Sequence, residues 1–288
     1  MRRFAVIDVG SNSVRLMLVA DGKVLYKRLN TTKLGEGLAQ APRLKEEAIE
    51  RTATAIAGFY AQAHFDGAEK VFAFATAATR SAENKEIFIE RVKRLCGLTI
   101  EVISGEEEAE IGLLGALGNK DGAIIDVGGA STEIVVKEAG EIVYKRSIDV
   151  GVVRLKDACG RDKQALTARA LLEVEKFGKV PTSLLFYGIG GTATTLAAQY
   201  LGLQEYQSDK ITGAVLPAEE IAALAEKFAL LPVEEIAELP CMPKGREDVI
   251  LGGAIWLSTL LNALNVKEII VSDRDNLEGY AIKRGWME

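Results

Sequence analysis

The chain has 288 residues, of which 48% are hydrophobic, enough to bury one or two substantial cores. Its net charge of −6 disfavours non-specific nucleic-acid binding, and its three scattered cysteines, with no Cys-x-x-Cys pair, disfavour a disulfide framework or a zinc site. No apolar run is long enough to span a bilayer and no signal peptide is recognisable. We therefore expect a cytoplasmic protein with neither membrane nor nucleic-acid partners.

The chain opens with a pattern of strand, polar loop and strand. Apolar residues 4–7 lead into Asp8, and a turn at residues 21–22 separates the second strand from a third, which predicts an antiparallel meander. Glycines and hydroxyl groups let a loop's backbone N–H groups approach a phosphate closely. The candidate phosphate-binding residues of this first loop are Gly10, Ser11, Asn12 and Ser13.

Arg80 follows a predicted helix over residues 45–64 and a predicted strand over residues 70–75. An arginine just after a strand end can clamp a phosphate in a bidentate fork. A surface arginine paired with a local carboxylate explains the same position equally well.

Glu108 lies in the first turn of a helix whose start is marked by the capping pattern Ser104 to Glu107. Its helical face continues with Gly112 and Gly115, a strip of small residues that lets another group approach closely. The alternative is an acidic first turn that simply faces solvent.

A second loop repeats the first. Residues 123–146 align without gaps on residues 5–28, 118 positions earlier, with ten identities in 24 positions. This length of similarity predicts two homologous domains whose loops face each other across a cleft. The candidate phosphate-binding residues of the second loop are Gly128, Gly129, Ala130, Ser131 and Thr132.

Carboxylates flank this second loop. Asp126 precedes it and Glu133 follows it, and Asp8 holds the equivalent place in the first repeat. Carboxylates beside phosphate donors are what a hard divalent cation, Mg²⁺ or Mn²⁺, would bridge. An ordinary β-hairpin with a glycine-rich turn is the alternative.

A third glycine-rich turn, Gly190, Gly191 and Thr192, stands at a predicted helix start. Unpaired first-turn N–H groups make it a plausible anion or nucleotide contact, although a plain strand-to-helix turn fits as well. Ser272 is the predicted cap of the final helix. The other elements expected here are helix 163–177, strands 184–187 and 211–216, helices 218–229 and 246–264, and strand 268–271.

His64 is the only histidine, and it lies on the predicted helix 45–64. A Ser-His-Asp triad, a histidine zinc site or a phosphohistidine would each have to be built on it, which we consider unfavourable. Phosphoryl chemistry by carboxylates, backbone amides, basic residues and a metal remains. In it Glu108 would orient water, with Asp8, Asp126 and Glu133 near the cation.

The sequence resembles the exopolyphosphatase/guanosine pentaphosphate phosphatase (Ppx/GppA) family of the actin, sugar kinase and heat-shock ATPase superfamily. The segments that carry the resemblance occur in the family's order: IDVGSNSVRLML, ATAATRSAEN, ISGEEEAEIG, IDVGGASTEIVV, VGVVRL, GGTATTLA and VSDRDNLEGY. It implies an α/β fold of two ribonuclease-H-like domains around a cleft. We expect these domains over residues 1–118 and 119–274, with helix 275–288 packing back on the first.

The resemblance also implies a reaction: metal-dependent hydrolysis of a terminal phosphoanhydride of polyphosphate or guanosine pentaphosphate. Glu108 matches the family's catalytic glutamate and Arg80 a substrate-phosphate arginine. We expect a short form of the family, without the extra C-terminal domain of longer members, and we expect a homodimer. A nucleotide- or (p)ppGpp-binding switch with little hydrolysis is the main alternative, and a sugar or carboxylate kinase is another.

Two departures from the family pattern stand out. Ala130 replaces a glycine of the second loop, and Asp275 adds a negative charge where glycine is common. We also expect the domains to close around substrate about a hinge at residues 117–122. Glu108 would then meet the Asp126 loop only on closure.

Overall fold

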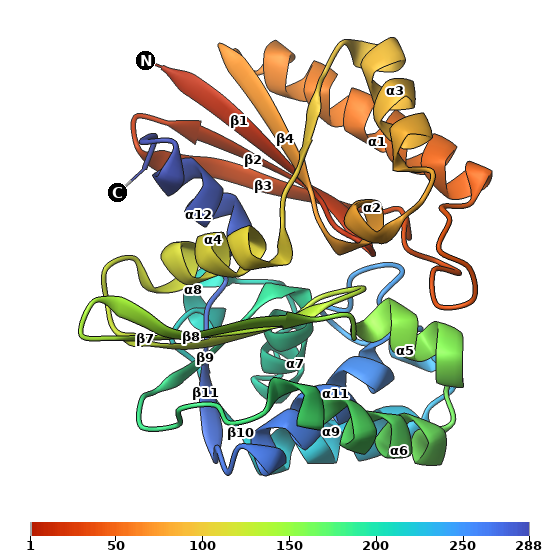
Figure 1. Cartoon of the computed structure of the whole chain (residues 1–288), viewed down its shortest axis with the longest axis vertical. Helices are drawn as coiled ribbons and strands as arrows, with labels where there is room; N and C mark the ends of the chain where they lie inside the picture. Colours follow the sequence, from red (N-terminus) through yellow and green to blue (C-terminus); the bar gives the residue numbers. More distant parts are fainter. Residues whose placement is uncertain (1, 288) are drawn as a thin grey trace.

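The computed structural model describes residues 2–287 as two halves, each built on one mixed β-sheet (Figure 1). The first sheet has the order β3-β2-β1-β4-β5, in which β1 to β3 form an antiparallel meander and β4 and β5 continue parallel to β1. The predicted meander is therefore confirmed. The strands are β1 (Arg3–Val9), β2 (Ser13–Ala20), β3 (Lys23–Thr31), β4 (Lys70–Ala75) and β5 (Ile100–Val102).

The second sheet repeats this topology. Its order is β10-β11-β9-β6-β7-β8, so three antiparallel strands are again followed by two that run parallel to the first, and β10 is added at the edge. The duplicated α/β fold is therefore confirmed. The strands are β6 (Gly122–Val127), β7 (Thr132–Glu138), β8 (Glu141–Ile148), β9 (Phe186–Ile189), β10 (Val215–Pro217) and β11 (Glu268–Val271).

The duplication extends to an irregularity of the hairpins. The register of the second strand pair shifts between Leu18 and Val19 in the first half, and between Val136 and Lys137 in the second. These two places correspond in the sequence alignment of the repeats. A β-bulge is a specific local feature, so its recurrence supports a common origin of the halves.

Both faces of the first sheet are covered, which explains why β1 and β2 are apolar at successive positions. Ile7 and Leu16 face α1 (Glu46–Phe65) and α3 (Lys85–Cys96), whereas their neighbours Val6 and Met17 face α12 (Asn276–Lys283). The short α2 (Ala77–Ser81) follows β4. The helix predicted over residues 45–64 is confirmed within one residue at each end.

The core of the second half centres on α11 (Ile250–Ala263), which is buried along almost its whole length and carries Trp256. The Trp256 indole N–H donates to Thr132 Oγ1 at 2.8 Å, so the largest core side chain is tied to the start of β7. The remaining helices of this half are α5 (Val152–Cys159), α6 (Lys163–Val174), α7 (Gly190–Tyr200), α8 (Ser208–Ile211), α9 (Ala218–Leu230) and α10 (Val233–Ala237).

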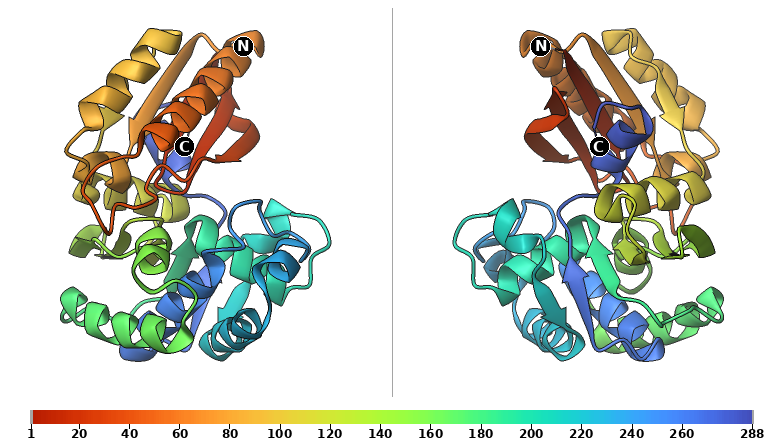
Figure 2. Two further views of the ribbon diagram at one scale, coloured as in Figure 1. Left: turned by 90° about the vertical axis from the view of Figure 1, so that its right-hand side faces the viewer. Right: turned by 90° about the vertical axis from the view of Figure 1, so that its left-hand side faces the viewer.

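Helices α4 (Gly105–Leu117) and α12 lie side by side between the two sheets (Figures 1 and 2). A Cβ on Gly115 would lie 1.9 Å from the Asp275 carbonyl oxygen, and one on Gly279 would lie 1.7 Å from the Ile111 carbonyl oxygen. The strip of small residues beside Glu108 therefore receives another helix of the same chain rather than a ligand.

The packing of α4 corrects one expectation about closure. Ala109, Leu113 and Leu117 pack on the second sheet, against Ile124 and Val135. The helix that carries Glu108 is thus already packed on the sheet that carries the second loop. Glu108 and this loop therefore do not need domain closure to meet. The division of the chain at residue 118 stays a prediction.

Two sequence expectations about local structure were wrong. Asp275, rather than Ser272, caps the final helix, because its side chain accepts the Leu277 N–H while the Glu278 side chain accepts the Asp275 N–H. The strand expected over residues 211–216 is shorter and later, as β10, and is preceded by α8. The five-residue α10 was not predicted.

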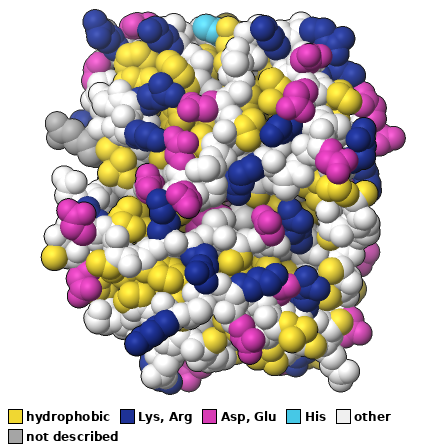
Figure 3. Space-filling view, in the orientation of Figure 1, with side chains coloured by type: hydrophobic (Ala, Val, Ile, Leu, Met, Phe, Trp, Pro, Cys, Tyr) yellow, Lys and Arg dark blue, Asp and Glu magenta, His cyan; other side chains and the backbone are white. Residues whose placement is uncertain are grey.

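Within residues 2–287, no helix combines the length and apolarity needed to cross a membrane. The three cysteines, Cys96, Cys159 and Cys241, are free thiols. Figure 3 shows basic and acidic side chains interspersed over the face that it draws, with no broad field of one sign.

Candidate active site

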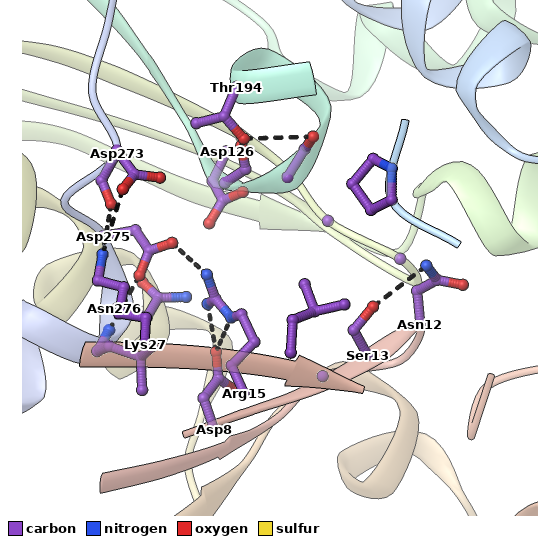
Figure 4. Close-up of a pocket in the computed structure, with 18 of the residues that line it drawn as sticks. Asp8, Asn12, Ser13, Arg15, Lys27, Asp126, Thr194, Asp273, Asp275 and Asn276 are labelled. Carbon is purple, nitrogen blue, oxygen red and sulfur yellow. Dashed lines mark hydrogen bonds and ion pairs between the residues drawn. The ribbon is translucent and has the colours of Figure 1, made fainter. Parts of the chain in front are cut away.

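A cavity of about 960 Å³ lies between the halves and is lined by residues of both. It brings together all three glycine-rich turns predicted from the sequence, and Figure 4 shows part of its wall. The predicted site residues that line it are Asp8, Gly10, Ser11, Asn12, Ser13, Glu108, Asp126, Gly128, Gly129, Ala130, Ser131, Gly190 and Gly191.

The two repeated loops touch one another. A Cβ on Gly129 would lie 2.7 Å from the Ser11 Cβ and 3.0 Å from the Asn12 nitrogen, so only glycine allows this approach. The loops therefore face each other as expected, but they are in direct contact at the wall of the cavity and not separated by it. Ala130, the departure from the family pattern, does not have a positive φ, so its methyl group causes no backbone strain there.

Each loop closes on itself in the same way. Gly10 N–H donates to Ser13 at 3.1 Å, and Gly128 N–H donates to Ser131 at 3.0 Å, both to backbone carbonyl oxygens. Within residues 2–287 the amides that follow Gly10 and Gly128 make no hydrogen bond. Amides left unpaired beside a cavity can cradle an anion.

Two predicted phosphate contacts do not line the cavity. The Thr132 hydroxyl donates to the Val150 carbonyl at 2.6 Å, and the Thr192 hydroxyl donates to the Val127 carbonyl at 2.8 Å. Both side chains are almost fully buried. These hydroxyl groups therefore stabilise the fold of the second half through hydrogen bonds to its backbone and do not face a ligand.

Glu108 is buried at the start of α4 and is held by Arg80, whose Nη1 donates to Glu108 Oε2 at 3.0 Å. The same nitrogen donates to the Ile103 carbonyl at 3.0 Å. Burial raises the pKa of Glu108 to about 7, although Arg80 opposes the rise. A carboxyl group with a pKa near neutrality is suited to take a proton from water. Arg80 does not line the cavity itself but holds this carboxylate in the cavity wall.

Asp126 and Glu133 lie directly opposite each other in the β6–β7 pair. Burial, followed by the charges of Asp275 and Glu108, raises the pKa of Asp126 to about 7. Burial also raises the pKa of Glu133, whose Oε1 accepts the Ser147 hydroxyl at 2.6 Å. Two neighbouring buried carboxylates call for a positive charge between them.

Gly190 makes room for this pair. Its φ is +74°, and a Cβ there would lie 2.3 Å from Asp126 Oδ1. The third glycine-rich turn therefore abuts the carboxylate of the second loop. Asp126 accepts no hydrogen bond among residues 2–287, so its oxygens are available to a ligand.

Asp8 is paired with an arginine of its own hairpin. Arg15 Nε donates to Asp8 Oδ2 at 3.1 Å, its Nη2 pairs with the same oxygen, and its Nη1 pairs with Asp275 (Figure 4). The other oxygen of Asp8, Oδ1, is buried without a partner. Burial raises the pKa of Asp8, and Arg15 lowers it in part.

Arg246 is a cavity residue that the sequence did not single out. It is 8% exposed, and its guanidinium makes no hydrogen bond or ion pair within the described residues. It lies over Gly191, where a Cβ would be 2.2 Å from Nη2. Burial lowers its pKa to about 10, so it stays charged at neutral pH. In the sequence it looked like the beginning of a predicted helix, and nothing there indicates that it faces a cavity.

The carboxylates suit a divalent cation held mainly by substrate and water. No three or more acidic, histidine or cysteine side chains in residues 2–287 form a ready-made metal cluster. Mg²⁺ usually takes one or two carboxylates, with waters and substrate phosphates completing its octahedral shell. The unpartnered Asp126 carboxylate and the orphaned Asp8 Oδ1 fit that requirement.

Comparisons with known proteins identify the family of the chain. The Ppx/GppA phosphatase family model matches residues 17–283. The chain is 32% identical to exopolyphosphatase 2 of Mycobacterium tuberculosis, with 98% of each covered. It is 28% identical to a guanosine-5'-triphosphate,3'-diphosphate pyrophosphatase of Vibrio vulnificus, covering 98% of this chain and 58% of that protein. The crystal structure of the Aquifex aeolicus Ppx/GppA family member superposes with a TM-score of 0.79 at 31% identity, covering 99% and 97%. The chain belongs to the Ppx/GppA phosphatase family.

Proposed function

We propose that this protein releases the terminal phosphate of inorganic polyphosphate or guanosine pentaphosphate by attack of water on the phosphoanhydride. The observation that carries the proposal is Glu108, a buried carboxylate with a pKa of about 7 in the wall of a cavity shared with two anion-cradling loops. Relatives named exopolyphosphatase and guanosine-5'-triphosphate,3'-diphosphate pyrophosphatase support the same two substrates.

The chain's own residues divide the work. Glu108 orients the attacking water and accepts its proton, and Arg80 keeps the carboxylate pointed at the cavity. The loop amides and the unpaired guanidinium of Arg246 bind phosphate oxygens and hold the terminal phosphate of the substrate in line with the attacking water. Positioning and charge stabilisation account for most of the catalysis of phosphoryl transfer, and these residues supply both.

A divalent cation is part of the proposal. Asp126 and Asp8, which both line the cavity, would hold Mg²⁺ or Mn²⁺ together with substrate oxygens. Glu133, the third predicted metal ligand, is buried beside Asp126 and does not line the cavity, so it would act through its charge or after a local rearrangement. When bound, the ion would neutralise charge on the phosphate oxygens and offset the repulsion among the buried carboxylates.

The test is phosphate release from polyphosphate, guanosine pentaphosphate and ATP, each with Mg²⁺. We expect steady turnover with at least one of the first two and little with ATP. Tight binding of guanosine pentaphosphate without turnover would instead support the regulatory switch, and phosphate transfer only with an added acceptor would support a kinase. Location in the cytoplasm and a homodimer stay predictions.

A further inference from the structure

Asp275 is fixed at the junction of the two halves, between β11 and α12. Its Oδ1 accepts the Leu277 N–H at 3.1 Å, and its own N–H donates to Glu278 Oε2 at 3.1 Å. Its carbonyl oxygen lies against Gly115 of α4, and the residue is 4% exposed. Asp275 is therefore held through its side chain, its backbone N–H and its carbonyl group.

The second oxygen of this carboxylate, Oδ2, pairs with Arg15 Nη1 (Figure 4). Arg15 uses Nε and Nη2 for Asp8, so carboxylates take up both sides of its planar fork. Burial would raise the pKa of Asp275, but the charges of Arg15 and Lys27 hold it below the usual value, so the carboxylate is ionised.

Arg15 and Arg246 both line the cavity, and they are close enough that the charge of Arg15 lowers the pKa of Arg246. They differ in availability. The Arg246 guanidinium has no partner within residues 2–287, whereas Arg15, whose side chain is 23% exposed, already has two. A phosphate that reaches Arg15 must displace or share the Asp275 carboxylate, and it also meets the negative charge of Asp275.

We propose that Asp275 is a positioning residue that lowers phosphate affinity by occupying Arg15 in place of a substrate phosphate. It thereby weakens the grip of the cavity on phosphate chains and eases their release. The inference rests on the proposed function only in that a phosphate chain enters this cavity. Asp275 pairs with Arg15 and with neither Glu108 nor Arg80, so we expect its main effect on binding and KM.

The experiment compares wild type with Asp275→Asn. Asparagine is as good a helix N-cap as aspartate, so the variant removes the charge and keeps the cap. Isothermal titration calorimetry with tripolyphosphate, without divalent metal, measures binding apart from hydrolysis. We expect Asp275→Asn to bind tripolyphosphate roughly 3- to 30-fold more tightly, because a charged competitor is lost. KM for the hydrolysed substrate should fall by a similar factor, with kcat within about threefold.

A matched control is Asp162→Asn. Asp162 is also a helix N-cap, accepting the Ala165 N–H at 3.0 Å, but it does not line the cavity. It should leave tripolyphosphate binding unchanged. If Asp275→Asn fails to fold, Asp275→Ser keeps a capping oxygen without the charge.

Two results would overturn the inference. One is folded Asp275→Asn that binds tripolyphosphate no more tightly than wild type. The other is a Mg²⁺ requirement raised as much as by Asp126→Asn, which would place Asp275 among the metal ligands. The proposed function can fail independently of this inference. If the protein hydrolyses neither substrate but Asp275→Asn binds tripolyphosphate more tightly, the inference about Asp275 stands and the proposed activity is wrong.

Discussion

Arg15 and Glu133 occupy equivalent positions in the two repeats, each directly opposite the aspartate near the end of its first strand. Arg15 lies opposite Asp8, and Glu133 lies opposite Asp126. Opposed residues of an antiparallel pair project from the same face. The first hairpin therefore presents a carboxylate neutralised by an arginine, whereas the second presents two carboxylates side by side. The two hairpins therefore differ in charge at this position: the first carries an ion pair, and the second carries two carboxylates without a basic partner between them.

This difference predicts which repeat governs metal dependence. Asp126→Asn should raise the Mg²⁺ concentration for half-maximal activity by about tenfold or more, since it removes an unpartnered hard oxygen ligand. Glu133→Gln should raise it less, because one oxygen of Glu133 is already bound by Ser147. Metal titration of phosphate release measures both.

The control for the metal titration is Asp121→Asn. Its carboxylate accepts the N–H groups of Ala139 and Gly140 at the far end of the second hairpin, away from the cavity. An unchanged Mg²⁺ requirement in both Asp126→Asn and Glu133→Gln would make those carboxylates structural members of the hairpin.

Glu108→Gln should lower kcat by about 10²- to 10⁴-fold and leave the fold intact, because the amide keeps the shape but cannot accept a proton. Glu107→Gln is the matched control, because Glu107 precedes Glu108 in the same helix but pairs with Lys283 at the surface. A larger loss in Glu107→Gln than in Glu108→Gln would mean that the two roles are exchanged.

The pH dependence of activity follows from the raised pKa of Glu108. A general base works only when deprotonated, so kcat/KM should level off above about pH 7 and fall by about tenfold per unit below it. A rate profile with saturating Mg²⁺ measures this. An acid limb near 4.5, the ordinary glutamate value, would contradict the role of burial.

Glu108 affects folding stability and activity in opposite directions: activity needs its deprotonated form, whereas the folded state is more stable with its protonated form. The pKa of Glu108 is higher in the folded than in the unfolded chain, so protonation stabilises the fold. This stabilisation is fully present below about pH 4.5 and is lost as the pH rises through about 7. Without metal at pH 8, Glu108→Gln should therefore be more stable than wild type by roughly 1–3 kcal/mol, with a smaller difference at pH 5. Urea denaturation at the two pH values measures both.

The sequence predicted the parts of the site that carry a local pattern. The loops at Gly10 and Gly128 can be recognised by their glycine and hydroxyl residues, and their repetition predicted the duplicated fold. Arg246 carries no such pattern, because it acquires its role only when distant segments meet. Asp275 stood out as a departure from the family pattern, but its pairing with Arg15 could not be predicted, since 260 residues separate the two. The helix that packs against Gly115 could not be predicted for the same reason, because α12 lies about 160 residues later in the chain.

Arg246→Gln tests the arginine that sequence analysis missed. Its guanidinium is buried, charged and unpaired in the described structure, so its removal should raise KM by roughly tenfold or more through the loss of charge-assisted hydrogen bonds to phosphate. Arg91→Gln, whose guanidinium pairs with Glu46 and Glu50 on the outer helices, is the control. Equal KM values for the two variants would show that Arg246 does not contact substrate.

The contact between α4 and α12 predicts a large asymmetry between two glycine-to-alanine substitutions. In Gly115→Ala the new methyl group would lie 1.9 Å from the Asp275 carbonyl oxygen, a rigid backbone atom, so the helices must move apart. We expect a loss of at least about 2–3 kcal/mol in the free energy of unfolding, as for overpacking of a tight core.

Gly58→Ala is the matched control, because Gly58 is also inside a helix, α1, but a Cβ there meets nothing within 4 Å. The higher helix propensity of alanine should stabilise that variant by roughly 0.5–1 kcal/mol. Urea denaturation of the two variants gives the comparison. Because α12 carries Asp275 at its start, Gly115→Ala should also disturb the pairing of Arg15 and change tripolyphosphate affinity, whereas Gly58→Ala should not. Equal stability of the two variants would show that α4 and α12 can separate without cost, and that their contact does not hold the two halves together.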